Sequence, residues 1–248
     1  MPPLEEKEKN RERYRRQLII DGWGEEGQER LANSRAFIAG AGGLGCPVAM
    51  GLACAGVGTI TICDSDRVEL SNLNRQFLHT EENLGTPKAE SARQALSRRN
   101  STIRIITLTE KISDDNVAGL IGDVDIILDC LDNFTARLAL NRYSVDRGIP
   151  LVHGAIWGME GRVTFIHPPH TPCLGCLYPA MPPAGGEIPV LGSVAAATGN
   201  IQATEAVLHL RGTPPSLAGS LLILDYATMH FQRLTMGRDR SCSHCAQP

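Results

Sequence analysis

The sequence predicts an α/β protein with a Rossmann-like, mostly parallel central sheet that continues into an antiparallel second half. Three observations support this fold class. A glycine-rich turn near residue 40 joins a short apolar strand to a helix, further apolar strands then alternate with helices, and two strands separated by a glycine turn follow. Such alternation implies right-handed crossovers, and the ends of parallel strands gather functional groups at one edge of the sheet.

With 248 residues and 42% hydrophobic content, the chain can bury a substantial core, either as one α/β domain or as two lobes, and we expect a single domain over residues 1–248. We expect a helical N-terminal arm at residues 1–34, a nucleotide-binding half at 35–133, and a second half at 134–248. A net charge of -3 and a pI near 6.2 argue against strong nucleic-acid binding, which favours a basic surface. The charged N-terminus lacks the apolar core of a signal peptide, so we expect a cytoplasmic protein.

The arm holds two charged helical segments, Glu5–Gln17 and Glu25–Asn33. The first strand, Ala36–Ala39, then ends at a turn in which Gly40, Gly42 and Gly45 have the spacing G-x-G-x-x-G. Glycines let this backbone turn sharply and approach a phosphate, and the following helix presents unpaired N–H groups to an anion. This pattern predicts a nucleotide-binding loop.

A second apolar strand, Thr59–Cys63, ends at Asp64, which is suited to bind a ribose hydroxyl. The uncharged stretch 36–63 is also long enough to span a bilayer. Its many glycines and Pro47 interrupt it, and membrane helices are rarely broken in this way unless other helices surround them. We therefore favour the nucleotide loop and expect no membrane partner.

The remaining elements follow from periodicity and turn residues. A polar loop at 65–85 precedes Thr86 and Pro87, which are typical of a helix start. In chain order, the pattern then predicts helix Lys88–Arg99, strand Ile103–Leu108, helix Asp114–Ile121, buried strand Val124–Cys130 and helix Phe134–Arg147. Strands Leu151–Trp157 and Arg162–His167 follow around a glycine turn, then an irregular connection from Pro168 to Gly192, helix Ser193–Leu210 and a last strand, Leu221–Asp225.

The eight cysteines are of two kinds. Four lie in apolar segments and are most simply small hydrophobic residues: Cys46, Cys54, Cys63 and Cys130. The others form two C-x-x-C pairs, Cys173/Cys176 and Cys242/Cys245, which favour a structural four-thiolate zinc site. Two unrelated redox pairs are the alternative, and we regard His244 as a surface residue rather than a ligand.

Charged residues follow the glycine loop and the later strands. Arg75 and Lys88 are placed to neutralise a triphosphate, although each taken alone is more often a surface residue. Asp132 follows the buried strand that ends near residue 130, and a carboxylate there suits Mg²⁺ bridging phosphate oxygens.

These residues resemble the MoeB/ThiF/HesA adenylyltransferases, which are related to the ubiquitin-activating enzymes. The likeness covers nearly the whole chain: Arg13–Gln17, the Gly40 loop, Asp64–Asp66, Asn72–Gln76, Gly85–Lys88, Asp129–Asn133 and both cysteine pairs. The resemblance implies a homodimer that binds ATP and Mg²⁺ and adenylates the C-terminal Gly-Gly carboxylate of a small ubiquitin-like carrier. Such carriers are similar to MoaD or ThiS, the sulfur donors for molybdopterin and thiamine synthesis. Residues 134–248 would then form the carrier-binding half.

The resemblance also implies roles for individual residues. Asp64 is similar to the ribose ligand, Asp132 to the catalytic aspartate linked to magnesium, and Arg16 to an arginine inserted by the dimer partner, with Arg13 and Arg15 as alternatives. The phosphate-binding set is Asn72, Arg75, Gln76 and Lys88. Gly40, Gly42, Gly43, Gly45, Asp66 and Asn133 complete the expected nucleotide site.

One departure concerns sulfur transfer. Many relatives carry a cysteine in the crossover connection, but the stretch Leu177–Asn200 contains none, and Gly185 or Gly186 takes its place. We therefore expect the protein to stop at the acyl-adenylate and to pass it to a separate sulfurtransferase. Three alternatives remain at this point: an NAD-dependent dehydrogenase, a tRNA-modifying adenylating enzyme of the same fold, and a non-catalytic dimeric scaffold.

Overall fold

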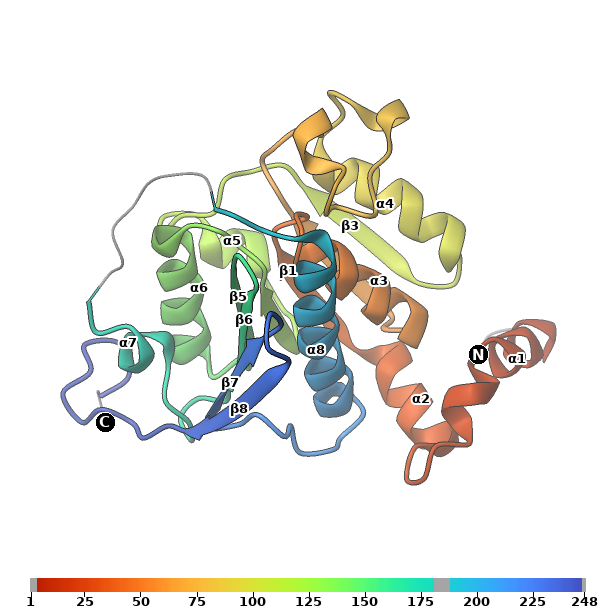
Figure 1. The fold of residues 1–248 in the computed structure, drawn as a ribbon. Coiled ribbons are helices and arrows are strands. Elements are labelled where there is room, and N and C mark those ends of the chain that lie inside the picture. Colours follow the sequence, from red (N-terminus) through yellow and green to blue (C-terminus); the bar gives the residue numbers. More distant parts are fainter. Residues whose placement is uncertain (1–3, 181–187, 247–248) are drawn as a thin grey trace.

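The computed structural model describes residues 4–180 and 188–246. Its centre is an eight-stranded sheet in the order β3-β2-β1-β4-β5-β6-β7-β8 (Figure 1). The strands are β1 (Arg35–Ala39), β2 (Thr59–Cys63), β3 (Arg104–Leu108), β4 (Ile126–Asp129), β5 (Leu151–Trp157), β6 (Glu160–Ile166), β7 (Ser220–Asp225) and β8 (His230–Thr235). The first five strands in this order, from the edge strand β3 to β5, pair in parallel. The remaining pairs, from β5 to the other edge strand β8, are antiparallel. The expected Rossmann-like fold class is confirmed.

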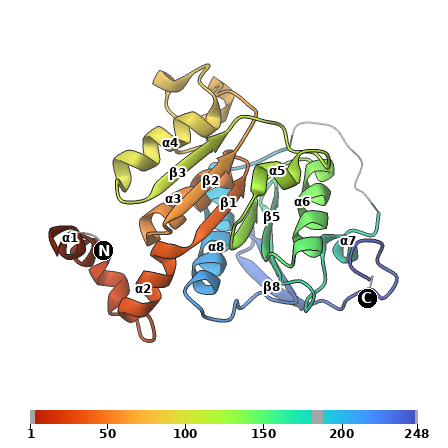
Figure 2. The same ribbon diagram turned by 180° about the vertical axis from the view of Figure 1, so that it is seen from behind.

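Helices cover both faces of the sheet (Figures 1 and 2). The α-helices of the described residues are α1 (Leu4–Leu18), α2 (Gly24–Asn33), α3 (Gly45–Ala55), α4 (Lys88–Arg99), α5 (Val117–Ile121), α6 (Phe134–Arg147), α7 (Leu174–Leu177) and α8 (Gly192–Leu210). Helices α3, α4 and α8 contribute to the core on one face, and α5 and α6 to the core on the other.

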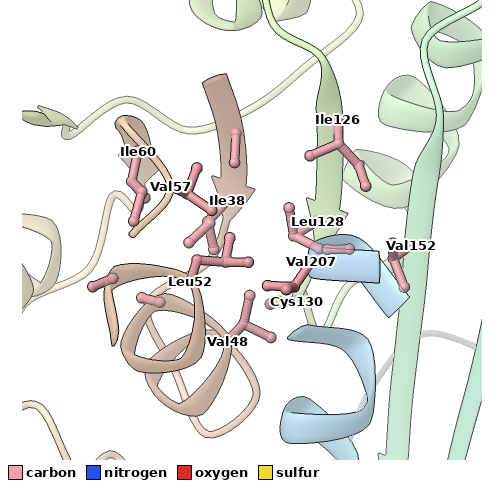
Figure 3. Packing of buried hydrophobic residues seen from close by; sticks show 14 of the residues in the cluster. Ile38, Val48, Leu52, Val57, Ile60, Ile126, Leu128, Cys130, Val152 and Val207 are labelled. Carbon is pink, nitrogen blue, oxygen red and sulfur yellow. The ribbon is translucent and has the colours of Figure 1, made fainter. Parts of the chain in front are cut away.

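Strand β1 shows why the sheet has two buried faces. Ala36 and Ile38 pack with α3 and α8, whereas the alternate residues Phe37 and Ala39 pack with α5 and α6. Figure 3 shows the first of these cores, in which Ile38 lies among side chains of α3 and the neighbouring strands. Because every side chain after Arg35 in this strand is buried, the strand is apolar without alternation.

Several local expectations were wrong. Strand β8 was not expected, because all six of its residues are exposed at the sheet edge and the segment lacks an apolar face. Thr86 does not cap α4, since Pro87 takes the N-cap position and no side chain accepts a hydrogen bond there. Cys54 is exposed rather than part of the core. Gly185 and Gly186, the positions expected to replace a loop cysteine, lie outside the described residues.

The stretch 36–63 forms β1, α3 and β2, which answers the alternative of a single membrane helix there. Within residues 4–180 and 188–246, no helix is both long and apolar enough to cross a bilayer.

Candidate active site

The glycine loop lies between β1 and α3, at the carboxyl edge of the parallel strands. Gly40 has φ of +97°, and a side-chain carbon there would lie 2.8 Å from the carbonyl oxygen of Cys130. A side-chain carbon on Gly45 would overlap the carbonyl of Gly40. These two positions therefore require glycine for backbone geometry. A side-chain carbon on Gly42 would make only an ordinary contact, 3.7 Å from the amide nitrogen of Gln76, so this position does not require glycine for backbone geometry.

The peptide of Ala41, in the middle of this loop, is held from both sides. Its N–H donates to Asp64 Oδ2 at 2.7 Å, and its carbonyl lies 3.0 Å from His79 Nε2. His79 Nδ1 lies 2.9 Å from the Ser91 hydroxyl, so the buried ring links the loop to α4. Burial lowers the pKa of His79 and favours the neutral ring. His79 was not expected in the site, because nothing in the sequence marks this histidine as buried.

Burial raises the pKa of Asp64, although the N–H groups of Ala41 and Asp66 oppose that shift. Asp64 thus both shapes the loop and presents an acceptor at the end of β2. Asp66 lies two residues on and forms an ion pair with Lys88, with 2.9 Å between the Lys88 ammonium and Asp66 Oδ2. The Lys88 side chain is 9% exposed and that of Asp66 is 67% exposed, so the pair lies at the mouth of the site.

The segment 70–76 reaches the loop from the other side. An added carbon on Gly43 would be 3.5 Å from Arg75 Cγ, so Arg75 lies against the loop. Its guanidinium donates to the Ser71 carbonyl at 2.8 Å and to Asn74 Oδ1 at 2.9 Å. Gln76 is buried, and its Oε1 has no hydrogen-bond partner among the described residues. Asn72 is buried but accepts from the Glu69 N–H at 3.1 Å, which gives it a local role in the turn.

Asp132 and Asn133 follow β4 at the same edge. Asp132 is exposed beyond Cys130, whose carbonyl lies beside Gly40. Asn133 is the N-cap of α6 and accepts from the Ala136 N–H at 2.9 Å. Asp132 therefore follows β4 at the edge of the sheet that carries the glycine loop, and Asn133 has a helix-capping role.

Arg16 is the one expected site residue that lies elsewhere. Tyr14, two residues earlier on α1, accepts from Asn100 at 2.9 Å, and Gln17 donates to the carbonyl of Ala55 at 3.1 Å. Ala55 is the last residue of α3, whereas the glycine loop is at the first turn of that helix. Eleven helical residues span about 16 Å, so Arg16 is held far from its own glycine loop.

A buried polar network beneath the edge was not expected from the sequence. Asp129, at the end of β4, accepts from His153 Nδ1 at 2.6 Å and lies 3.7 Å from the guanidinium of Arg137. Burial disfavours ionisation of Asp129, but Arg137 and His153 outweigh it, and the pKa of Asp129 is lowered. Burial lowers the pKa of His153 despite that carboxylate. Gln202 donates to the carbonyls of Asp129 and Val152 at 2.9 and 3.2 Å.

A second cluster lies away from this edge. The thiols of Cys173, Cys176, Cys242 and Cys245 all lie within 4.8 Å of one another. This cluster could hold a metal ion, and it joins α7 to the C-terminal tail (Figure 1).

The fold and this edge define a nucleotide-binding α/β protein, because a glycine loop at a helix start meets carboxylates and cations at the carboxyl ends of parallel strands. The model of the ThiF family matches residues 14–245, and the chain belongs to that family.

Similar proteins agree with this assignment. The sulfur carrier protein adenylyltransferase of Thermus thermophilus is 39% identical over 244 residues, covering 94% of this chain and 90% of that protein. The molybdopterin-synthase adenylyltransferase of Escherichia coli is 40% identical over 243 residues, covering 95% and 96%. The crystal structure of E. coli MccB with ATP has a TM-score of 0.86 at 23% identity, covers 95% of this chain and 75% of that one, and shows a shared fold.

Proposed function

We propose that this protein uses ATP to adenylate the C-terminal Gly-Gly carboxylate of a small ubiquitin-like sulfur carrier, similar to MoaD or ThiS, and releases pyrophosphate. The observation that carries the proposal is the meeting of the glycine loop with Arg75, Lys88 and Asp132 at one edge of the sheet. Relatives named as adenylyltransferases of a sulfur carrier and of molybdopterin synthase support a role in molybdopterin or thiamine biosynthesis.

The chemistry requires neither a protein nucleophile nor a base, because the carrier carboxylate is already ionised at neutral pH. It attacks the α-phosphorus of ATP, the new P–O bond forms, and pyrophosphate leaves with the electron pair of the broken bond. The residues of this chain position the reactants and offset charge on the phosphoryl oxygens. Arg75 and Lys88 supply the cations, Asp64 binds the ribose, and Gln76 offers a polar side chain beside Gly42.

Magnesium fits the site through Asp132. Its carboxylate is exposed and has no hydrogen-bond partner among the described residues, which leaves its oxygens available to a hard cation. Asp132 would hold Mg²⁺ at this position, and the ion would supply positive charge against the phosphate groups of ATP. Asn133 contributes indirectly by capping α6, directly after Asp132.

We also propose a homodimer in which Arg16 completes the site of the partner subunit. Arg16 lies on an arm fixed at the far end of α3, and it is exposed. Ile19 and Ile20 follow it with 69% and 48% exposure, and neighbouring exposed apolar side chains of this size favour an intermolecular contact. Arg16 can then act only in trans.

The thiol cluster fits a structural zinc ion. Tetrahedral coordination at about 2.3 Å places the sulfur atoms about 3.8 Å apart. The Cys173–Cys242 and Cys176–Cys245 pairs are separated by 3.7 and 3.4 Å. We propose that this zinc ties the connection after β6 to the tail of the single domain, 1–248.

The remaining proposals concern the binding partners of the protein and its location in the cell. The absence of a cysteine from residues 177–200 supports transfer of the acyl-adenylate to a separate sulfurtransferase. Residues 35–133 would bind the nucleotide and residues 134–248 the carrier. The protein would act in the cytoplasm, without a nucleic-acid or membrane partner.

The test is ATP–pyrophosphate exchange, with and without candidate carriers that end in Gly-Gly. We expect carrier-dependent exchange in the wild type and a loss of about a hundredfold in Asp132→Ala. Asp146→Ala is the matched control, because Asp146 is exposed at the opposite end of α6. No exchange with any carrier, together with tight NAD binding, would support a dehydrogenase and overturn the proposal.

A further inference from the structure

Arg137 ties together two backbone segments that the ladder between β4 and β5 leaves unpaired with each other. The ladder between β4 and β5 ends at the pair Asp129 and His153. Beyond that pair, the Arg137 guanidinium donates to the carbonyl of Leu131, with 3.1 Å from Nε, and to the carbonyl of Gly154 at 3.0 Å. Its side chain is 6% exposed. Arg137 therefore replaces strand pairing at the catalytic edge.

These contacts act on the residue next to Asp132. Leu131 precedes Asp132, and its N–H donates to Asp129 Oδ1 at 3.2 Å, so both of its peptide groups are held. Asn133 follows Asp132 and is fixed as the cap of α6. Asp132 is thus placed through its fixed neighbours, and the placement on the β4 side depends on Arg137.

We propose that Arg137 is a positioning residue for the adenylation reaction, which directs Asp132 by holding the carbonyls of Leu131 and Gly154. The inference rests on the proposed function, because Asp132 is assigned its role there. Arg137 itself is buried, and its guanidinium carbon also lies 5.4 Å from the centre of the Phe134 ring.

The choice of arginine has a physical reason. A planar guanidinium with several N–H groups can bridge two carbonyls and still face the Asp129 carboxylate, whereas a lysine ammonium offers a single point charge. The strands do not need Arg137 in order to pair, because Gln202 independently bridges the carbonyls of Asp129 and Val152. Its contacts are instead concentrated where Asp132 leaves the sheet.

The decisive variant is Arg137→Lys, which keeps the positive charge beside Asp129 and removes the bridge. We expect kcat for carrier-dependent exchange to fall by ten- to about a hundredfold, as for a displaced catalytic group, with the KM for ATP changed by less than about twofold. Arg142→Lys on the same helix is the matched control, since Arg142 pairs with Asp114 at the surface. That control should keep wild-type kcat.

A double-mutant cycle separates positioning from a general structural role. If Arg137 acts through Asp132, Arg137→Lys should cost little further activity in an Asp132→Asn background. An unchanged kcat in Arg137→Lys, a matching rise in the KM for ATP, or an equal further loss in that background would each overturn the inference.

Two further outcomes are also distinguishable. Wild-type protein without exchange contradicts the proposed function, whereas active wild type with an unaffected Arg137→Lys contradicts only the positioning role. If Arg137→Lys does not fold, the pair Asp129→Asn with Arg137→Gln removes both buried charges and allows the same kcat and KM comparison.

Discussion

Complementation between two inactive variants offers a direct test of the trans role of Arg16. Arg16→Ala and Asp132→Ala are each expected to be nearly inactive as pure dimers. In a mixed dimer, the site on the Arg16→Ala protomer keeps its own Asp132 and receives an intact Arg16 from the partner. Random exchange of equal amounts makes half of the dimers mixed, with one working site in each, so about a quarter of wild-type activity should return.

The structure explains why only a dimer can show this recovery. Gln17 is anchored to Ala55 at the end of α3, about 16 Å along the helix from the glycine loop, so an arginine acting within its own chain is too distant. The assay is carrier-dependent ATP–pyrophosphate exchange after co-denaturation and refolding of the two variants. Mixing Asp132→Ala with Lys88→Ala is the control and should recover no activity, because both residues are assigned to the site of their own chain. Activity that stays at the level of the separate variants in the first mixture would refute the reasoning.

In a mixed dimer of the control, one site lacks the Asp132 carboxylate and the other lacks the Lys88 ammonium. Both sites then remain defective, so the mixture should stay inactive. Activity regained in both mixtures would show that the recovery does not depend on Arg16. Activity regained in the Arg16→Ala mixture alone supports a contribution of Arg16 across the subunit interface.

Three further predictions concern the loop, the thiol cluster and the buried network. Gly45→Ala should lower kcat/KM for ATP by about a hundredfold, because the new methyl group overlaps the carbonyl of Gly40 and displaces the loop. Metal analysis should find one zinc ion per chain, and both chelation and Cys176→Ser should lower the thermal unfolding midpoint. Asp129→Asn should destabilise the protein by about 3 kcal/mol at neutral pH, because it leaves a buried guanidinium without its carboxylate.

Each of these predictions has its own control or contrary result. Gly119→Ala, where an added carbon meets nothing within 4 Å, should leave ATP kinetics unchanged. Cys54→Ser alters an exposed cysteine outside the cluster and should retain zinc. Because the folded pKa of Asp129 lies below its ordinary value of 3.8, its stabilisation is present above that pH and is lost as pH falls through the folded pKa. The difference between wild type and Asp129→Asn should therefore shrink in acid, and a constant difference would contradict the assignment.

Most of the fold could be predicted because its strands carry strong local signals. The β1–α3–β2 unit has an apolar strand, a glycine turn and a second apolar strand, and each lies where it was expected. Strand β8 has no such signal in its own residues, because all of them are exposed, and it pairs with β7 across a short turn in which Asp225 accepts from the Ala227 and Thr228 N–H groups. Edge strands of this kind are determined by their neighbour rather than by their own periodicity.

The site was predictable only where residues follow known strand ends. Asp64 comes directly after β2 and Asp132 lies shortly beyond the end of β4 at Asp129, so topology places both at one edge of the sheet. His79, Arg137 and His153 have no comparable marker, since a buried histidine or arginine has the same sequence appearance as an exposed one. Their roles depend on burial and on partners that come together only in the folded chain.

The charges at the edge link nucleotide binding to the proposed dimer. Within one chain, the carboxylates outnumber the cations: Asp64, Asp66 and Asp132 face Arg75 and Lys88. Lys88 is already paired with Asp66, so much of its charge is compensated before a triphosphate arrives. A strongly anionic ligand then needs further positive charge at the site. Magnesium on Asp132 and Arg16 of the partner subunit would supply it, which gives an electrostatic reason for an ATP site shared between two chains.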